Sequence, residues 1–436
     1  MREMKDSGIA WIGVIPQDWE IVRTKSLYCS AKEIAGDRAD DFERLALTLN
    51  GVIKRSKEDS VGLQPEKFSG YQILKKGELV FKLIDLENVT TSRVGLSPYT
   101  GIVSPAYIVL SKQSRAKDLV VRYSMYHFLS MWQREIFNQM GDNGVRSSLN
   151  AKELLNIPHP FPSIYEQKRI VAFLDAQCAE IDAVLEKTRA SIEEYKKLKQ
   201  AVITQAVTKG IRGDRPMKDS GIEWVGDIPV EWDVVRQKYF WNTVESGVSV
   251  NAADKPVDNS EQYGVLKTSA VSKFVFIPTE HKQVNLEEYG RVSCPVRADS
   301  IIASRMNTPE LVGACGYVQN NYPNLFLPDR LWQITFKDGL SPKYAWYYLS
   351  GIRVRQYISS LSTGTSSSMQ NISQSQYGNI FITIPSIGEQ SEITKYLDEK
   401  CRSVDALVTK KQQYLTEIEN YKKSLIYEYV TGKREA

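Results

Sequence analysis

Two polar loops contain the residues of this chain whose types are best suited to bind a charged ligand. Residues 141–150 read GDNGVRSSLN and residues 362–371 read STGTSSSMQN, and each loop follows a stretch with a helical pattern. Backbone N–H groups and hydroxyls in such loops can bind phosphate oxygens, and the longer Arg146 or Gln370 can reach further. Plain connecting loops have the same composition, so the sequence leaves both roles open.

Metal-ligand spacing is absent from the sequence. The five cysteines form no CxxC pair, and the three histidines are His127, His159 and His281, without the spacing of a zinc site. Cys178 and Cys401 occupy equivalent positions of an internal repeat, and we expect both to be small core residues on a helix seam. No cofactor is predicted for the chain itself.

One tetrapeptide points to an enzymatic alternative. Ser104-Pro105-Ala106-Tyr107 approaches the Ser-Pro-Pro-Tyr pattern of amino-methyltransferase sites, but the second proline is missing and the parallel stretch reads Leu327-Pro328-Asp329-Arg330. The sequence also contains no convincing glycine-rich loop for a methyl donor and no GxxxxGK[ST] nucleotide loop. We therefore interpret the tetrapeptide as a turn that enters a strand, with a stand-alone DNA methyltransferase as the alternative.

Composition is ordinary for a globular protein. The 436 residues are 42% hydrophobic and 25% charged, and 56 basic against 52 acidic residues give a net charge of +4. This balance permits a nucleic-acid partner without requiring one. A run of ~18 apolar residues, as a membrane span needs, is absent, and residues 1–5 lead into a charged stretch. We expect a cytoplasmic protein.

The elements that position these loops occur twice. MKDSGIAWIGVIPQDWEIVR (residues 4–23) recurs as MKDSGIEWVGDIPVEWDVVR (217–236) with 13 of 20 positions identical. EQKRIVAFLD (166–175) recurs as EQSEITKYLD (389–398), whereas residues 24–160 and 237–383 have largely diverged. The chain is therefore a tandem duplication in which two similar frames hold two different contents.

Each second echo opens a long helix. Apolar residues recur at alternating spacings of three and four from Cys178 to Ala206 and again from Cys401 to Tyr429, as in a coiled-coil seam. Ser163 and Ser386 are suited to cap the two helices, and a glycine follows each end. At ~1.5 Å per residue each helix spans about 65 Å. We expect the two stripes to bury each other in an antiparallel pair, with a globular segment at either end; two unrelated helices are the alternative.

The globular segments have the pattern of mixed α+β domains. Strands are expected near residues 77–81, 106–110, 300–303 and 331–334, and helical stretches at 120–137 and 342–359. The paired tryptophans of each repeat, Trp11 with Trp19 and Trp224 with Trp232, are expected to be core anchors rather than a binding platform.

The Ile-Pro-x-x-Trp opening, the Pro-Ser-Ile-x-Glu-Gln entry to a long helix and the Val-Thr-Lys-Gly or Val-Thr-Gly-Lys exit, each present twice, resemble the specificity subunit of type I restriction-modification enzymes over the whole chain. The resemblance implies an α+β protein with two target recognition domains (residues 1–160 and 211–385) and two antiparallel helices (161–210 and 386–436). It also implies double-stranded DNA as ligand, two methylation subunits that carry S-adenosylmethionine, and motor-nuclease restriction subunits. The chain itself would be non-catalytic.

Residues beside the strand ends and polar loops are the predicted DNA contacts. Arginine and lysine can read guanine, and asparagine and glutamine can read adenine, in the major groove. The predicted set is Lys54, Arg55, Lys82, Arg93, Asn143, Arg146 and Ser147 in the first domain, and Lys267, Lys273, Arg305, Asn307, Ser366, Ser368 and Gln370 in the second.

A third possibility is a coiled-coil scaffold with two protein-binding heads and no DNA role. Net charge alone does not exclude it, whereas a steeply salt-dependent DNA affinity would argue against it.

Overall fold

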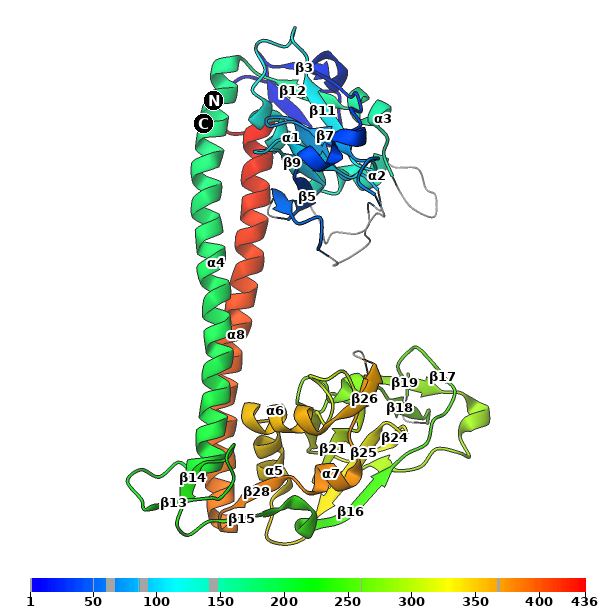
Figure 1. Cartoon of the computed structure of the whole chain (residues 1–436), viewed down its shortest axis with the longest axis vertical. Coiled ribbons are helices and arrows are strands. Elements are labelled where there is room, and N and C mark those ends of the chain that lie inside the picture. The colour runs from blue at the N-terminus through cyan, green and yellow to red at the C-terminus, as the bar shows by residue number, and fades with distance from the viewer. Residues whose placement is uncertain are drawn as a thin grey trace. The chain divides into compact units, whose positions relative to one another are not determined.

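The computed structural model describes residues 2–49, 51–59, 67–84, 86, 93–140, 148–259, 261–366 and 369–436. The chain forms two compact units, and each of the two long helices belongs partly to both (Figure 1). Unit 1 consists of Met1–Arg189 with Gln413–Ala436, and unit 2 of Ala190–Gln412.

Unit 1 contains two four-stranded sheets, in the orders β6-β5-β10-β7 and β4-β11-β8-β9, and the two-stranded pairs β1-β2 and β12-β3. Its strands are β1 (Met4–Asp6), β2 (Val14–Pro16), β3 (Glu20–Arg23), β4 (Tyr28–Cys29), β5 (Arg44–Thr48), β6 (Gly51–Arg55), β7 (Gln72–Leu74), β8 (Leu79–Phe81), β9 (Val94–Leu96), β10 (Gly101–Val103), β11 (Ile108–Lys112) and β12 (Pro158–Phe161). Its shorter helices are α1 (Val121–Gln133), α2 (Ile136–Met140) and α3 (Ala151–Asn156), with 3₁₀ turns at Thr24–Ser26 and Gly36–Asp41.

The core of unit 1 forms where α1 packs on the edge of the β4-β11-β8-β9 sheet. All three residues of β8 are 0% exposed, as expected for a short apolar run that is covered on both faces. Phe81 of β8 meets Phe128 of α1 edge to face, with ring centroids 5.1 Å apart. This contact joins the sheet to the helix.

Unit 2 contains sheets in the orders β16-β25-β21-β23, β17-β19-β18-β24-β20 and β22-β27-β26, and the pairs β13-β14 and β15-β28. Its strands are β13 (Met217–Asp219), β14 (Asp227–Pro229), β15 (Asp233–Arg236), β16 (Trp241–Ser246), β17 (Ala252–Ala253), β18 (Gly264–Leu266), β19 (His281–Val284), β20 (Pro295–Val296), β21 (Ser300–Ser304), β22 (Met306–Asn307), β23 (Cys315–Val318), β24 (Tyr322–Phe326), β25 (Leu331–Phe336), β26 (Thr363–Ser366), β27 (Met369–Asn371) and β28 (Phe381–Ile384). Its shorter helices are α5 (Pro342–Leu349), α6 (Ile352–Leu361) and α7 (Gln374–Gly378), with 3₁₀ turns at Gln237–Phe240, Thr268–Ala270 and Leu286–Glu288.

The core of unit 2 forms where α5 covers β21 and β23. All residues of β21 are buried. Beside it, Gly316 of β23 allows the main chain of another segment to approach, because a Cβ at this position would lie 2.5 Å from the backbone nitrogen of Phe276. The mixed α+β class predicted for both globular segments is confirmed.

The two long helices are α4 (Ile164–Lys209) and α8 (Ile387–Val430). The predicted caps are confirmed, since the hydroxyls of Ser163 and Ser386 each accept a 3.3 Å hydrogen bond from the backbone N–H of the residue three positions later. After the helices, Gly210 and Gly432 adopt φ of +76° and +70°, a conformation that glycine reaches without strain. Within the described ranges, none of the helices combines the length and apolar character that spanning a membrane requires.

The helices pack on each other in each unit, as predicted. In unit 1, Ile181 of α4 shares a buried cluster with Leu425 of α8, near the start of one helix and the end of the other. In unit 2 the order is reversed, with Ile203 of α4 and Leu397 of α8 in one cluster. The pair is therefore antiparallel. Cys178 and Cys401 are buried seam residues with free thiols, as expected.

Three details differ from or remain beyond the predictions. Each predicted helical stretch is divided in two: Glu135 adopts a left-handed φ of +57° between α1 and α2, and Gly351 is extended between α5 and α6. The paired tryptophans are unequal, because Trp19 and Trp232 are 0% exposed whereas Trp11 and Trp224 are half-buried. The predicted domain boundaries stay a prediction, since each compact unit includes parts of both helices.

A pair of buried histidines distinguishes unit 1. The rings of His127 on α1 and His159 on β12 lie 4.5 Å apart between centroids, and both side chains are buried. His159 Nδ1 donates to the Pro160 carbonyl at 2.7 Å, so its Nε2 accepts from the Ser124 hydroxyl at 2.9 Å. Burial lowers the pKa of His159 to about 4 and that of His127 well below its usual range. The matching position of unit 2, by strand register, is Ile382.

We therefore predict that acid destabilises unit 1 selectively. A histidine whose pKa is lowered by folding binds fewer protons in the folded state than in the unfolded state. The free energy of unfolding therefore begins to decrease as the pH falls below about 6.5, and it continues to decrease until about pH 4. For His159 alone the free energy of unfolding should drop by about 1–2 kcal/mol between pH 7.5 and 5.5. Hydrogen exchange, corrected for intrinsic rates, should show weaker protection in α1 and β12 but not in α5 and β28.

His159→Gln is the control, because it removes one titrating group and should reduce the difference between the two pH values. Equal loss of protection in both units at pH 5.5 would contradict the prediction.

Candidate nucleic-acid interface

Each globular part is attached to a long helix through a glutamate in the first turn of that helix. In unit 1 the Trp19 indole N–H donates to Glu166 Oε2 at 2.9 Å, and the guanidinium of Arg2 pairs with the same carboxylate. Arg2 also lies over the Trp19 ring, 5.8 Å from its centroid, and pairs with Asp18 at 2.7 Å. One carboxylate at the start of α4 thus joins the N-terminal segment to the helix.

Unit 2 repeats this arrangement. The Trp232 indole donates to Glu389 Oε2 at 2.9 Å, Arg215 pairs with Glu389 at 2.6 Å and lies 4.9 Å from the Trp232 centroid, and Arg215 also pairs with Glu231. The glutamate is 5% exposed, so its charge is compensated by the arginine and by the indole hydrogen bond. We refer to these two constellations as the anchors.

The glutamine that follows each anchor glutamate forms a hydrogen bond to the start of a shorter helix, α1 or α5. Gln167 Nε2 donates to the carbonyls of Asp118 and Pro162, and its Oε1 accepts from the backbone N–H of Val120, the residue before α1. In unit 2 the amide of Gln390 makes the same three bonds. Each α1 or α5 start is therefore tied to the start of a long helix.

Further along each long helix, one aspartate accepts hydrogen bonds from a tyrosine and from a basic side chain. In unit 1, Tyr126 and Arg122 of α1 both donate to Asp175. In unit 2, Tyr347 and Lys343 of α5 both donate to Asp398. Burial, reinforced by the carboxylate, raises the pKa of both tyrosines, so both stay protonated donors. From the sequence, the Glu-Gln dipeptide is expected only to cap the helix. The anchors could have been suspected because the same dipeptide occurs in both repeats, each of which also contains paired tryptophans.

In unit 2 the structure brings three predicted DNA contacts together on the small β22-β27-β26 sheet. Asn307 of β22 lies directly opposite Gln370 of β27, and Arg305 immediately precedes β22. The Arg305 backbone is held on both sides, by the carbonyl of Arg330 and by the N–H of Ile372. All three side chains are half-buried, and the Asn307 Nδ2 has no hydrogen-bond partner among the described residues. In the backbone register of the same sheet, Ser366 of β26 pairs with Met369 of β27.

A buried arginine holds the segment that follows β22. Arg355 of α6 donates to the carbonyls of Glu310 and Val312, at 3.2 and 2.6 Å, and is 8% exposed. Burial lowers its pKa. Sequence reasoning did not single out this residue, because a surface arginine and a buried one look alike in sequence.

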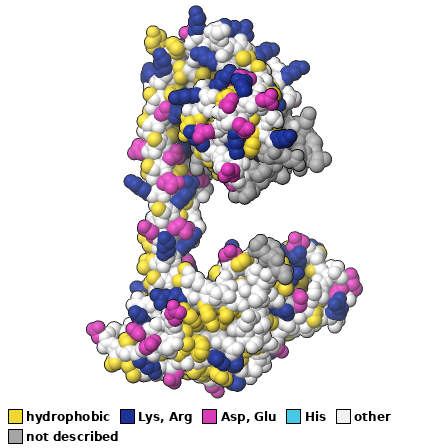
Figure 2. Space-filling model, viewed as in Figure 1, with side chains coloured by type: hydrophobic (Ala, Val, Ile, Leu, Met, Phe, Trp, Pro, Cys, Tyr) yellow, Lys and Arg dark blue, Asp and Glu magenta, His cyan; other side chains and the backbone are white. Residues whose placement is uncertain are grey.

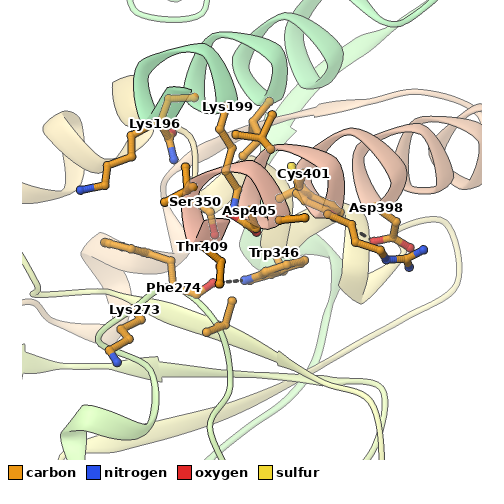
Figure 3. A pocket seen from close by; sticks show the side chains of 18 residues that line it. Lys196, Lys199, Lys273, Phe274, Trp346, Ser350, Asp398, Cys401, Asp405 and Thr409 are labelled. Atoms are coloured by element: carbon orange, nitrogen blue, oxygen red, sulfur yellow. Dashed lines mark hydrogen bonds and ion pairs between the residues drawn. The ribbon is translucent and has the colours of Figure 1, made fainter. Parts of the chain in front are cut away.

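Lys267 and Lys273 lie elsewhere in unit 2. Lys267 pairs with Asp254 at 3.2 Å at the start of a 3₁₀ turn. Lys273 lines a groove of about 790 Å³ between a loop and the long helices, next to the Trp346 indole that donates to the Phe274 carbonyl at 2.8 Å (Figure 3). They are not brought together with Arg305, Asn307 and Gln370.

In unit 1 the predicted cations on β6 face acidic partners. Lys54 pairs with Glu43 at 2.6 Å, and this carboxylate raises the Lys54 pKa. The Arg55 guanidinium donates to Asp59 at 2.7 Å. Both cations line a hollow of about 580 Å³ that also contains Glu58. Their charge is partly neutralised within the chain.

Arg93 corrects the predicted set. Its side chain is 0% exposed and donates to the carbonyls of Ile84 and Leu86, so it stabilises the interior and has no surface with which to contact DNA. The Lys82 N–H donates to the Arg93 carbonyl, and Ile84, two residues further along, forms a β-bridge with Ser148 of the polar loop. Four predicted residues lie outside the described ranges, namely Asn143, Arg146, Ser147 and Ser368.

Charge is not concentrated on the visible surface. On the face shown in Figure 2, basic and acidic side chains are interspersed in both units. On this face, recognition of a polyanion would therefore depend on a few local groups rather than on one continuous basic surface.

Comparison with known proteins agrees with this duplicated architecture. The model of the type I restriction modification DNA specificity domain matches residues 16–194 and again 229–419. The chain is 25% identical to the type I restriction enzyme MjaVIII specificity subunit of Methanocaldococcus jannaschii, covering 96% of this chain and 93% of that protein. It is 24% identical to the putative MjaX specificity subunit of the same organism, with coverages of 97% and 95%.

A solved chain from a type I R-M system shares the fold, with a TM-score of 0.68 at 16% identity over 96% of this chain and 99% of that one. Because the family model covers most of the sequence in two copies, the chain belongs to the type I restriction-modification DNA specificity family, whose subunits recognise DNA and are not themselves catalytic.

Proposed function

We propose that each globular part reads one half of a bipartite, asymmetric DNA site. The observation that carries this proposal is that the two anchors are the same whereas the polar surfaces they support differ. Glu166 and Glu389 make matching bonds to tryptophan and arginine, but the β22-β27-β26 sheet of unit 2 is not matched among the described strands of unit 1. Two different polar surfaces, each held by an equivalent anchor, recognise two different half-sites.

The proposed reading surface of unit 2 is centred on Arg305, Asn307 and Gln370. A guanidinium can bind guanine, and an amide can bind adenine, with about 1–3 kcal/mol of discrimination for each good bidentate pair. The cross-strand position of Asn307 and Gln370 places both amides on one small sheet. Lys267, Lys273, Ser366 and Ser368 complete the set in unit 2, and Lys54, Arg55, Lys82, Asn143, Arg146 and Ser147 form the set in unit 1.

The long helices are proposed to act as spacer and as docking surface. The specificity subunit would bind two methylation subunits, which supply S-adenosylmethionine, and motor-nuclease restriction subunits. Repetition of the frame offers two equivalent surfaces to two identical partners. In support, Tyr414 and Tyr421 of unit 1 lie seven residues apart along α8 and are 49% and 52% exposed. Such a row is typical of a helix that packs on a partner.

A stand-alone methyltransferase is less well supported. The Tyr107 N–H bonds to the Ser104 carbonyl at 3.1 Å, so the Ser-Pro-Ala-Tyr tetrapeptide forms the turn that enters β11. A scaffold without DNA contact is disfavoured by membership of a DNA specificity family.

The proposal predicts that the two halves of the recognised sequence change independently. Replacing residues 24–160 with the corresponding segment of another specificity subunit should alter only one half of the methylated motif. The measurement is genome-wide mapping of modified bases in cells that contain the chimera and its methylation partner. Loss or change of both halves, with the chimera folded, would contradict independent reading.

Spacer length should be a mechanical property of α4 and α8. One heptad inserted in both helices, at Ala190 and at Gln412, adds about 10 Å, which corresponds to about three base pairs of DNA. We expect the gap between the two half-sites to lengthen while the half-sites stay the same. An unchanged methylated sequence would refute the spacer role.

Single substitutions should separate base contacts from phosphate contacts. If Lys82 binds a phosphate, Lys82→Ala should weaken binding to all sequences and reduce the salt slope of the DNA affinity by about one. If Arg305 reads a base, Arg305→Ala should cost about 1–3 kcal/mol and relax specificity at one position. Lys117→Ala, on an exposed turn of unit 1, is the matched control. Affinities equal to that of the control would remove both residues from the proposed surface.

A further inference from the structure

An arginine takes part in the contact at each place where one long helix begins beside the end of the other, but it follows the ending helix in unit 2 and lies on the beginning helix in unit 1. In unit 2, Arg212, which follows the end of α4, pairs with Glu392 in the first turns of α8 at 2.8 Å. Both side chains are about half exposed. Glu392 raises the pKa of Arg212 through this hydrogen bond. Here the cation, Arg212, follows the C-terminal end of α4, and the anion, Glu392, lies near the N-terminal end of α8.

In unit 1 the charges are exchanged. Arg169, in the first turns of α4, donates to the main-chain oxygen of Ala436, and Glu435 lines the same hollow of about 300 Å³. The repeat aligns Arg169 with Glu392 and Arg212 with Glu435. In unit 1 the cation Arg169 therefore lies on the helix that begins, and Glu435 of the ending segment lines the same hollow.

This exchange matters because the two helices are similar enough to pair with copies of themselves. Two ion pairs in the seam, Asp182–Lys422 and Lys199–Asp405, occupy aligned positions with the same charges in both repeats. Such pairs would form equally in a pairing of like with like, because each repeat contains both an aspartate and a lysine. They stabilise the antiparallel seam without selecting the partner.

The helix ends, in contrast, select the partner. If two copies of the first repeat paired, Arg169 of one would face Arg212 of the other, twice. If two copies of the second repeat paired, Glu392 would face Glu435, twice. A further pair, Arg189–Glu419 at 2.7 Å, adds to the first case, since the residue aligned with Glu419 is Lys196. Like charges that face each other oppose association and give specificity between otherwise similar partners.

We propose that the charges at the helix ends make the first repeat pair with the second and reject a second copy of itself. The interaction surface consists of Arg169, Arg212, Glu392 and Glu435, and its partner is the unlike repeat. Where each globular part reads one half-site, as proposed above, this selection keeps the recognised sequence asymmetric, because a pair of like repeats would read a palindrome.

A cut chain tests this selection. A protease cleavage sequence is inserted between Gly213 and Asp214, which are both exposed, and the folded full-length protein is cut there. The halves are then allowed to exchange below the unfolding transition, and native mass spectrometry counts like and unlike pairs. Isotope-labelled cut protein, mixed with unlabelled protein, shows that exchange has occurred.

The decisive variant is Arg212→Glu combined with Glu392→Arg. It retains opposite charges in the native pairing, yet it also gives opposite charges to both like pairings. We expect like pairs to be less than about a tenth of the total in the unmodified protein and to rise several-fold in this double variant. The control is Asp182→Lys combined with Lys422→Asp, which preserves the native pairing but adds repulsion to like pairs, so like pairs should stay rare.

Two results would overturn the proposal. One is a statistical mixture of like and unlike pairs in the unmodified protein, and the other is no increase in the double variant. The uncut chain provides a second measurement: Arg212→Glu and Glu392→Arg should each lower the thermal midpoint, and the double variant should recover it. Absence of this recovery would show that the ends do not interact. Neither readout involves DNA, so failure of this proposal is distinguishable from failure of the proposed function.

Discussion

The architecture depends on placing one carboxylate at the start of each long helix and surrounding it with donors. Glu166 and Glu389 sit in the first turn, where the helix dipole also favours a negative charge. Each accepts from an indole and pairs with an arginine that stacks on that indole. A buried carboxylate is costly unless it is fully paired. The anchor therefore forms as a whole, and it joins a globular part to the start of its long helix.

The parts of the fold that could be predicted are those that the duplication repeats. The seam positions, the serine caps and the glycine ends follow from spacing and from local conformational preference, and the structure confirms them. The breaks in the shorter helices could not be predicted in this way. Glu135 has no preference for a left-handed conformation, so its φ is imposed by the packing of α1 and α2.

The candidate site was less predictable than the frame, because exposure is a tertiary property. Arg93 was predicted as a DNA contact on the same grounds as Lys82, yet Arg93 is turned inward to two carbonyls. Asn307 and Gln370 are far apart in sequence and become neighbours only through the pairing of β22 with β27. The Glu-Gln dipeptide of each anchor is repeated in the sequence and could be noticed there. Its hydrogen bonds to tryptophan, to arginine and to the start of a distant helix could be found only from the structure.

The apolar row of α8 affects how the chain behaves in isolation. Tyr414 and Tyr421 of unit 1 form a short apolar strip that is about half exposed to solvent. Water is displaced from such a strip whenever another apolar surface is near, including that of a neighbouring molecule. Covering these side chains therefore lowers the free energy of the chain, and the gain grows with the apolar area that is removed from water.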